Sequence, residues 1–395
     1  MLEISERTRS LGTENAFVVL KEVNELISQG KDVVNFCIGQ PDFDTPEYIK
    51  EAAIKAIKDG KTGYTPSPGI PELREAVAEY FSESRNIDVK PEWVVVANGA
   101  KPFISYVILS VTDYGKGEEV LYPNPGFPIY ESQIRASGAV PVPLPLLESK
   151  GYAFDVEYLE RKINEKTRLL ILNSPHNPTG GVLDKDTLEQ IADIVKRHEN
   201  LWVFSDEVYS HMVHDGEFVS IASFPGMQER TIIVDGVSKT YAMTGWRIGF
   251  AAGPKYLIDN ILTIQQHSTS GPSTFAQKGC VGTLSKAEEL VKNIVETCRR
   301  NRDLIVKEMS EIEGIECPKP PGAFYIFPAA EKLGLSGTDL MFKLLDHGVA
   351  IAPGELFGED FKYHFRMCYA MPEDLVKEGL ERMKSFFQQL KQGVK

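Results

Sequence analysis

Residues 168–206, RLLILNSPHNPTGGVLDKDTLEQIADIVKRHENLWVFSD, decide the fold class of this chain. The stretch opens with an apolar run that ends in polar and turn-forming residues, and a second apolar run, 201–204, ends in the same way. Between them, residues 183–197 repeat apolar side chains three and four positions apart, which predicts an amphipathic helix. Strands that are apolar on both faces and alternate with helices are typical of a parallel sheet covered by helices.

The same alternation extends to both sides of this stretch, so we expect an α/β protein with a mainly parallel sheet in a large domain. Further apolar runs rich in β-branched residues lie at 93–97, 119–122, 231–234 and 247–251.

The pattern changes after about residue 285, which predicts a second, smaller α+β domain. Amphipathic helices are expected at 286–311 and 372–393, with short strands around 323–327 and 364–368, and residues 33–38 are a candidate to join them. We therefore divide the chain into an N-terminal arm with the first part of the small domain (1–45), a large domain (46–285) and a small C-terminal domain (286–395).

The composition and net charge of the chain argue against several classes of binding partner. The 395 residues include 43 Lys and Arg against 56 Asp and Glu, a net charge of −13, which argues against binding nucleic acid or anionic lipid. No apolar run approaches the ~20 residues that span a bilayer, and the first residues lack the pattern of a secretory signal. Five scattered cysteines without a C-x-x-C spacing fit a reducing cytosol. We expect a cytoplasmic protein with neither a nucleic-acid nor a membrane partner.

Several common motifs, including G-x-G-x-x-G after a strand and H-E-x-x-H, are missing from the sequence. His211 and His214 stand three apart beside Asp215, a spacing that suits a metal on a helix, but no third clustered ligand accompanies them. We therefore expect no metal site.

Polar residues follow four of the predicted strands directly. In an open parallel sheet, ligands bind outside the carboxyl ends of the strands, so these residues are expected to share one site. They are Asn98-Gly99-Ala100-Lys101, Asn173 to Gly180 (NSPHNPTG), Ser205 to Tyr209 (SDEVY) and Asp235 to Lys239 (DGVSK).

These segments, together with SKTYAMTGWRIGF and the late FRMCYA, resemble the class I/II pyridoxal-phosphate aminotransferases of fold type I, and the prokaryotic aspartate aminotransferases among them. The shared motifs are N-P-T-G, D-x-x-Y, and S-K with an arginine eight residues beyond the lysine. The similarity runs from GQPDFDTP, at residue 39, to the final helix. It implies pyridoxal 5′-phosphate as cofactor, a homodimer, a seven-stranded large-domain sheet and a small domain built from both chain ends.

The resemblance also implies catalytic roles. Lys239 would form an imine with the cofactor aldehyde and then carry the proton, and Asp206 would keep the pyridine nitrogen protonated. Asn177 and Tyr209 would hydrogen-bond the phenolic oxygen of the ring. Because Tyr209 follows Asp206 by three residues, one helical turn, both are expected to face the ring.

Further cofactor contacts are implied for the phosphate and the ring. The phosphate would meet backbone N–H groups at a helix start, a hydroxyl and a guanidinium, and one tyrosine would reach it from the partner subunit. The residues are Gly99, Ala100, Lys101, Ser238, Arg247 and, from the partner, Tyr64, with Phe127 stacked on the ring.

On the substrate side, the resemblance implies that Arg366 clamps the α-carboxylate in a bidentate pair, with Gly39 and Asn177 beside it. The reaction would move an amino group between an L-amino acid and a 2-oxo acid such as 2-oxoglutarate in ping-pong half-reactions. Lys101 stands where one prokaryotic branch of aspartate aminotransferases binds the distal carboxylate, so aspartate is the expected donor.

Two sets of alternatives stay open. Glu14 and Asn15 stand where that branch places a serine, and an acidic side chain there would favour neutral or aromatic donors over aspartate. A β-eliminating lyase or a racemase on the same fold would also use Arg366 and Tyr209. A non-catalytic sensor is disfavoured, because only about forty residues precede the first shared motif and they are not basic.

Overall fold

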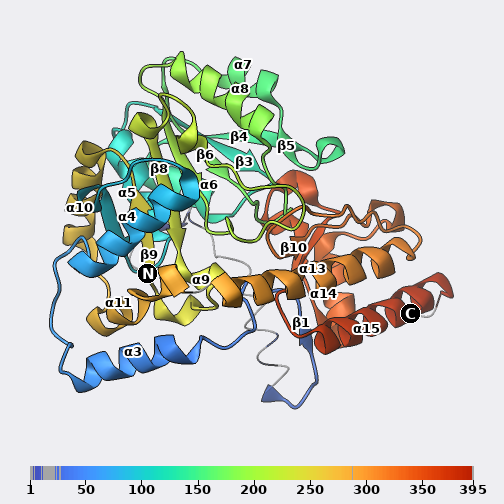
Figure 1. The fold of residues 1–395 in the computed structure, drawn as a ribbon. Coiled ribbons are helices and arrows are strands. Elements are labelled where there is room, and N and C mark those ends of the chain that lie inside the picture. Colours follow the sequence, from blue (N-terminus) through green and yellow to red (C-terminus); the bar gives the residue numbers. More distant parts are fainter. Residues whose placement is uncertain are drawn as a thin grey trace.

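A computed structural model describes residues 3, 5–9, 11, 23, 25, 28–286 and 288–393 of the chain. Its centre is an eight-stranded sheet in the order β2-β9-β8-β7-β6-β3-β4-β5 (Figure 1). The strands are β2 (Val94–Ala97), β3 (Glu119–Asn124), β4 (Val140–Leu147), β5 (Ala153–Phe154), β6 (Thr167–Asn173), β7 (Trp202–Asp206), β8 (Thr231–Gly236) and β9 (Gly249–Ala252).

The sheet is mainly parallel, as the sequence predicts. The neighbouring strands β8, β7, β6, β3 and β4 run parallel, whereas β9 is antiparallel to both β2 and β8. All six apolar runs named from the sequence form strands of this sheet, with shifts of a few residues at their ends.

The expected number of seven strands is wrong by one, because β5 adds a two-residue strand antiparallel to β4. Strand β4, VPVPLPLL, is not among the predicted strands, and prolines occupy alternate positions of its first six residues. Val140 donates its N–H to the Glu118 carbonyl, so alternate residues pair with the β3 side. At the proline positions an N–H would face the opposite edge of β4, so the prolines remove no hydrogen bond to β3. On that opposite edge, β5 pairs only with Leu146 and Leu147.

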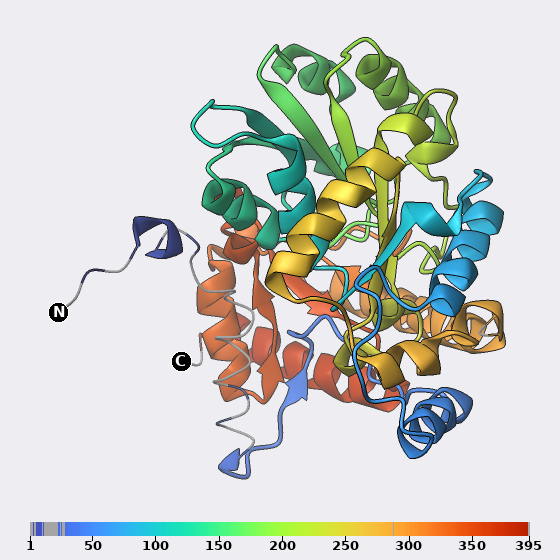
Figure 2. The same ribbon diagram turned by 90° about the vertical axis from the view of Figure 1, so that its left-hand side faces the viewer.

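Helices cover both faces of the sheet (Figures 1 and 2). Helices α5, α6 and α10 cover one face of the sheet and pack on side chains such as Val95, Phe204 and Ile232. Helices α4 and α8 cover the other face, to which the side chains next to these in each strand point. The helices of this part are α3 (Glu47–Lys58), α4 (Pro71–Arg85), α5 (Pro102–Val111), α6 (Ile129–Ser137), α7 (Val156–Lys162), α8 (Lys185–Lys196), α9 (Val237–Thr240), α10 (Lys255–Ser268), α11 (Thr274–Cys280) and α12 (Thr283–Lys286).

The amphipathic helix predicted at 183–197 is α8. Asp184 caps its amino end by accepting a hydrogen bond from the Thr187 N–H at 2.7 Å. Its apolar stripe, which includes Leu188, Ile191 and Val195, is buried against the sheet.

The two ends of the chain meet in a second group of elements, as predicted. The strand β1 (Val34–Asn35) pairs in parallel with β11 (Val349–Ala350), and a three-stranded sheet has the order β10-β13-β12. The other elements of this group are β10 (Tyr325–Ile326), β12 (Ala352–Pro353), β13 (Phe365–Cys368), α13 (Glu288–Ser310), α14 (Gly337–Asp346) and α15 (Glu373–Lys391), whereas α1 (Glu6–Arg9) contacts α6. The division at residues 45 and 285 stays a prediction.

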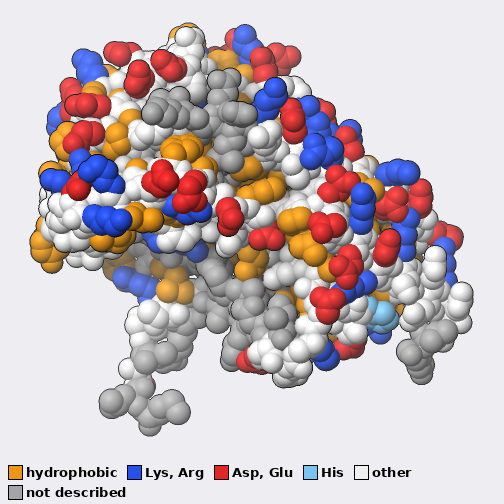
Figure 3. All heavy atoms as spheres, turned by 60° about the horizontal axis from the view of Figure 1, so that its bottom comes forward, with side chains coloured by type: hydrophobic (Ala, Val, Ile, Leu, Met, Phe, Trp, Pro, Cys, Tyr) orange, Lys and Arg blue, Asp and Glu red, His pale blue; other side chains and the backbone are white. Residues whose placement is uncertain are grey.

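On the face drawn in Figure 3, Lys and Arg side chains are interspersed with Asp and Glu side chains. Among the helices of the described residues, none combines the length and the apolar character that crossing a bilayer would require.

Candidate active site

A cavity of about 580 Å³ opens at the carboxyl ends of β6, β7 and β8, where the sequence predicts a shared site. Most of the predicted site residues line it, although they come from distant parts of the chain. They are Gly39, Ala100, Lys101, Phe127, Asn177, Asp206, Tyr209, Ser238, Lys239, Arg247 and Arg366.

Asp206 ends β7 and places a buried carboxylate at the base of the cavity. Tyr130, on α6, donates its hydroxyl to Asp206 Oδ2 over 2.6 Å. Burial raises the pKa of Asp206 to about 6, and the Tyr130 hydrogen bond opposes that rise. The carboxylate is therefore ionised at neutral pH and suits a buried cationic partner.

Lys239, on α9, directs its amine to the Gly39 carbonyl, 2.5 Å away. Burial lowers the pKa of Lys239 to about 8, and the charges of Arg366, Arg247 and Lys101 lower it further. About a tenth of the lysine is then unprotonated at pH 7, compared with less than a thousandth at the ordinary pKa of ~10.4. The cavity thus holds an amine that can act as a nucleophile.

Tyr209 lines the same cavity as Asp206, but the expected helical turn between them is wrong. The chain leaves β7 through consecutive turns, in which Ser210 N–H bonds the Glu207 carbonyl and Met212 N–H bonds the Tyr209 carbonyl. The Tyr209 hydroxyl lies 2.8 Å from that of Tyr325, on β10.

Arg366 lies on β13 and is buried. Its Nη1 donates to Asn177 Oδ1 over 2.8 Å and its Nη2 to the Cys37 carbonyl over 2.7 Å. Its Nε is buried without a hydrogen-bond acceptor among the described residues. The guanidinium also stacks at 4.6 Å from the Tyr325 ring centre and 4.7 Å from that of Phe357. These contacts fix the orientation of the Arg366 guanidinium, which suits the binding of an anion.

Arg247 lines the cavity and packs against Gly99, which is not itself a lining residue. Gly99 has a φ of +87°, and a Cβ there would lie 2.3 Å from Arg247 Nη2. Arg247 itself has a φ of +57°, and its Nη2 donates to the Asn98 carbonyl over 3.3 Å. The start of α5 has N–H groups without intrahelical partners, and Ala100 and Lys101, which directly precede it, line the same cavity as Ser238 and Arg247.

The predicted residues Lys101 and Tyr64 differ in their position relative to the cavity. Lys101, just before α5, places its Nζ 5.6 Å from the centre of the Phe127 ring, and both line the cavity. Tyr64 lies outside the cavity of its own chain and its side chain is fully exposed. Glu14 and Asn15 lie outside the described residues.

The sequence predicts Asn173 at this site, but it does not predict Tyr130 or Tyr325. Tyr130 contacts Asp206, Tyr325 contacts Tyr209, and Asn173 donates to the Asp206 carbonyl over 3.0 Å. Asn173 directly follows a predicted strand, whereas the tyrosines stand in a helix and a strand with no such mark.

His211 and His214 do not converge on a common point. His211 Nε2 lies 2.9 Å from the Tyr80 hydroxyl, whereas His214 Nε2 lies 2.7 Å from the Ala323 carbonyl. Among the described residues, no group of three or more His, Cys, Asp or Glu side chains is arranged to hold a metal ion.

Comparisons with known proteins agree with this geometry. The family model described as aminotransferase class I and II matches residues 31–383. An aspartate/prephenate aminotransferase of Cereibacter sphaeroides is 35% identical over 98% of this chain and 99% of its own length. An aromatic-amino-acid aminotransferase of Thermococcus litoralis is 39% identical over 92% and 94%.

Among solved structures, the aspartate aminotransferase of Thermus thermophilus with maleate superposes with a TM-score of 0.93 at 36% identity. The superposition covers 98% of this chain and 100% of that one. The sequence match and the superposition both span nearly the whole chain, and the chain therefore belongs to the class I and II aminotransferases of fold type I.

Proposed function

We propose that this protein is a pyridoxal-phosphate-dependent aminotransferase that takes dicarboxylic donors, aspartate first, and passes the amino group to 2-oxo acids such as 2-oxoglutarate. One observation carries the proposal: a lysine of lowered pKa, a buried carboxylate and a buried arginine with a free Nε line the same cavity. These three groups are Lys239, Asp206 and Arg366.

The cavity fits the cofactor in three ways. Gly99, which has no Cβ, lets the Arg247 guanidinium lie against the backbone, and Arg247, the start of α5 and Ser238 offer donors to a phosphate. Asp206 offers a buried negative charge to a pyridinium nitrogen, and Asn177 and Tyr209, which line the same cavity, would hydrogen-bond the phenolic oxygen. Phe127 would stack on the ring.

When bound, pyridoxal 5′-phosphate supplies an aldehyde that condenses with amines and a ring that withdraws electrons from the substrate Cα. The residues of the chain do the rest. Lys239 would hold the cofactor and later move the proton at the substrate Cα, and Asp206 would keep its negative charge beside the ring nitrogen. Arg366 would bind the α-carboxylate in place of its present carbonyl partner, with the Gly39 backbone beside it.

Dicarboxylate preference is supported by Lys101, whose ammonium lies at the cavity wall over Phe127. The Thermus thermophilus relative was solved with maleate, which is a dicarboxylate. A second candidate, an aromatic donor, is favoured by the apolar side of the cavity and by the Thermococcus litoralis relative. That side includes Ile38, Ile104, Leu356 and Phe357.

A homodimer is supported by exposed apolar side chains on neighbouring helices. Ile54 and Ile57 on α3 are each 49% exposed, Phe275 on α11 is 38% exposed, and these two helices pack together. The fully exposed Tyr64 lies in the loop after α3, free to reach a partner's phosphate site. The five free cysteines support a reducing, cytoplasmic location.

The deciding experiment is a co-product assay on the purified protein with added cofactor. Conversion of 2-oxoglutarate to glutamate in step with loss of aspartate is expected. In a parallel assay with O-acetylserine, which carries a leaving group on Cβ, release of ammonia, pyruvate and acetate without 2-oxoglutarate would show elimination instead. A donor panel with aspartate, glutamate, phenylalanine and tyrosine then ranks kcat/KM, and prephenate is added as an alternative acceptor. A phenylalanine value above that of aspartate would replace the dicarboxylic assignment by the aromatic one.

A further inference from the structure

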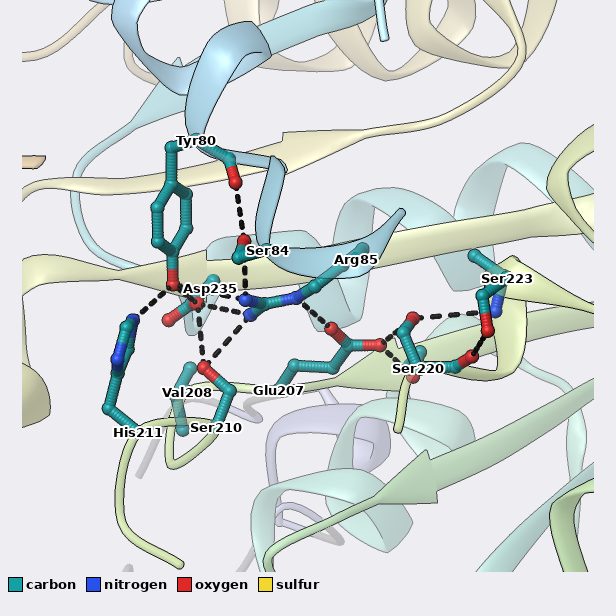
Figure 4. A network of polar contacts seen from close by, with 12 residues as sticks. Tyr80, Ser84, Arg85, Glu207, Val208, Ser210, His211, Ser220, Ser223 and Asp235 are labelled. Carbon is teal, nitrogen blue, oxygen red and sulfur yellow. Dashed lines mark hydrogen bonds and ion pairs between the residues drawn. The ribbon is translucent and has the colours of Figure 1, made fainter. Parts of the chain in front are cut away.

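A fully buried arginine lies behind the cavity and outside its lining. Arg85 ends α4, and its guanidinium sits between two carboxylates (Figure 4). Its Nε donates to Glu207 Oε2 over 2.8 Å, and its Nη2 donates to Asp235 Oδ2 over 2.8 Å. The same Nη2 also donates to Ser210 Oγ over 2.9 Å. One side chain thus ties α4 to the segments that follow β7 and to the end of β8.

The residues that Arg85 holds are close neighbours in sequence of residues in the proposed site. The two strands involved are adjacent, with the Glu207 N–H bonded to the Val234 carbonyl over 2.8 Å. Glu207 follows Asp206, Ser210 follows Tyr209, and Asp235 precedes Lys239 by four residues.

We propose that Arg85 is a positioning residue of the active site, which fixes the chain segments that carry Asp206, Tyr209 and Lys239. The inference rests on the proposed function, because these three residues are the ones that would hold the cofactor. Arg85 itself touches neither cofactor nor substrate and acts through its three tethers.

The network around Arg85 has the completeness that positioning requires. Glu207 Oε1 accepts from Ser205 Oγ over 2.8 Å and from Ser220 Oγ over 2.6 Å. Asp235 Oδ2 also accepts from the Tyr80 hydroxyl over 2.8 Å. Buried polar networks that are fully bonded restrict the conformations of the chain that carries them, so these tethers leave the strand ends few alternatives.

The network also bears on the charge at Asp206. Burial raises the pKa of Glu207 and of Asp235, and the positive charge of Arg85 opposes both shifts. The negative charges of Asp235 and Glu207 in turn raise the pKa of Asp206. The guanidinium therefore favours the ionised form of two carboxyl groups near the one that would face the ring nitrogen.

Arg85→Lys is the sharpest test, because it keeps the charge and removes the fork that reaches Glu207, Asp235 and Ser210 together. Arg302→Lys is the matched control. Arg302 is equally buried on α13 and bonds Asp215 over 2.5 Å and the Pro320 carbonyl over 3.0 Å, away from the cavity lining.

Three quantities are measured well below the melting temperature of each variant: the Kd for pyridoxal 5′-phosphate, the pH at which the bound cofactor changes its absorbance, and kcat with KM. The melting temperature of the cofactor-free protein is recorded separately. A purely structural role predicts a lower melting temperature for both variants and unchanged values for the other three.

The proposal expects Arg85→Lys alone to raise the Kd tenfold or more, to shift the absorbance midpoint, and to lower kcat more than it changes KM. If Arg85→Lys does not fold, Ser210→Ala, which removes a single tether, is expected to raise the Kd two- to fivefold. Values for Arg85→Lys, or for Ser210→Ala in its place, that match Arg302→Lys in all three quantities would overturn the positioning role. Wild-type protein that neither binds the cofactor nor transfers amino groups would instead overturn the proposed function, and the positioning role with it.

Discussion

Lys239 Nζ donates a hydrogen bond to the carbonyl oxygen of Gly39, 2.5 Å away and 200 residues earlier in the chain. The contact joins the segment after β1, which belongs to the group formed by both chain ends, to the helix that follows β8 of the central sheet. Arg366, from the same group, adds a second contact across the junction by donating to Oδ1 of Asn177, which follows β6 of the central sheet. The amine and the anion-binding fork therefore meet only because the two parts of the chain close on each other.

Replacing the lysine is the most direct test of the site. Lys239→Ala is expected to abolish covalent attachment of the cofactor and to lower turnover at least about a thousandfold, because no other amine takes its place in the proton transfer. Borohydride reduction followed by mass spectrometry of the peptide checks the attachment, and the variant should still bind cofactor through Asp206 and Arg247. A variant that retains near-normal activity would refute the assignment.

Asp206→Asn should preserve the fold and slow proton removal from the substrate a hundredfold or more, since a neutral amide does not keep the ring nitrogen protonated. Each tenfold loss corresponds to about 1.4 kcal/mol of barrier. Single-turnover absorbance measurements give the rate, and Asp186→Asn at the exposed start of α8 serves as control. An effect below tenfold would show that Asp206 is not the ring partner.

Lys101→Ala tests the donor preference. If its ammonium binds the distal carboxylate, kcat/KM should fall tenfold or more for aspartate and little for phenylalanine, because a pair desolvated in the closed site is worth more than an exposed one. Lys332→Ala, an exposed lysine paired with Glu316, is the control for a general loss of charge. Equal losses on both donors would mean that Lys101 serves the cofactor instead.

Gly39→Ala probes the close packing around the substrate side. A Cβ at residue 39 would lie 2.2 Å from the Tyr325 hydroxyl, so the tyrosine must move, and with it the surface on which Arg366 stacks. We expect KM for the amino acid to rise tenfold or more, with a smaller change in the Kd for cofactor. Gly282→Ala, where a Cβ meets open space, should leave both unchanged. An unaltered KM in Gly39→Ala would argue against this arrangement.

The buried histidines predict how stability depends on pH. Burial lowers the pKa of His176 to about 3, and that of His211 and His214 to about 4, from an ordinary value of 6.5. Below pH 6.5 these histidines are protonated in the unfolded chain but remain neutral in the folded protein. Each histidine therefore lowers the free energy of unfolding as the pH drops from about 6.5 to about 4. Asp206, with its raised pKa, acts in the opposite direction below pH 6.

Denaturant unfolding of His176→Asn at several pH values isolates one such contribution. Between pH 6 and pH 4 its free energy of unfolding should vary with pH by about 1 kcal/mol per unit less than that of the wild type, since one titrating group is removed. His267→Gln, at the exposed end of α10, should follow the wild type. A slope equal to the wild-type value in His176→Asn would show that His176 titrates normally.

Local patterns in the sequence were enough for the secondary structure and for much of the site. Apolar runs followed by polar residues located β6, β7 and β8 together with Asp206 and Lys239, because a buried strand must be apolar along its length and ligands bind where such strands end. The same reasoning failed at β4, because its prolines suggest that it cannot pair within a sheet. The prolines prevent hydrogen bonds only on the edge that faces β5, and β5 pairs with just two residues of β4.

Only the tertiary structure decided which side chains complete the site. Tyr130 reaches Asp206 from another helix, Tyr325 reaches Tyr209 from the small sheet, and Arg85 reaches Glu207 from the end of α4. Each of these residues has an ordinary apolar or helical context in the sequence, so no spacing marks it. Their roles arise because a buried hydroxyl, carboxylate or guanidinium must find a partner, and the partner lies wherever packing brings distant segments together.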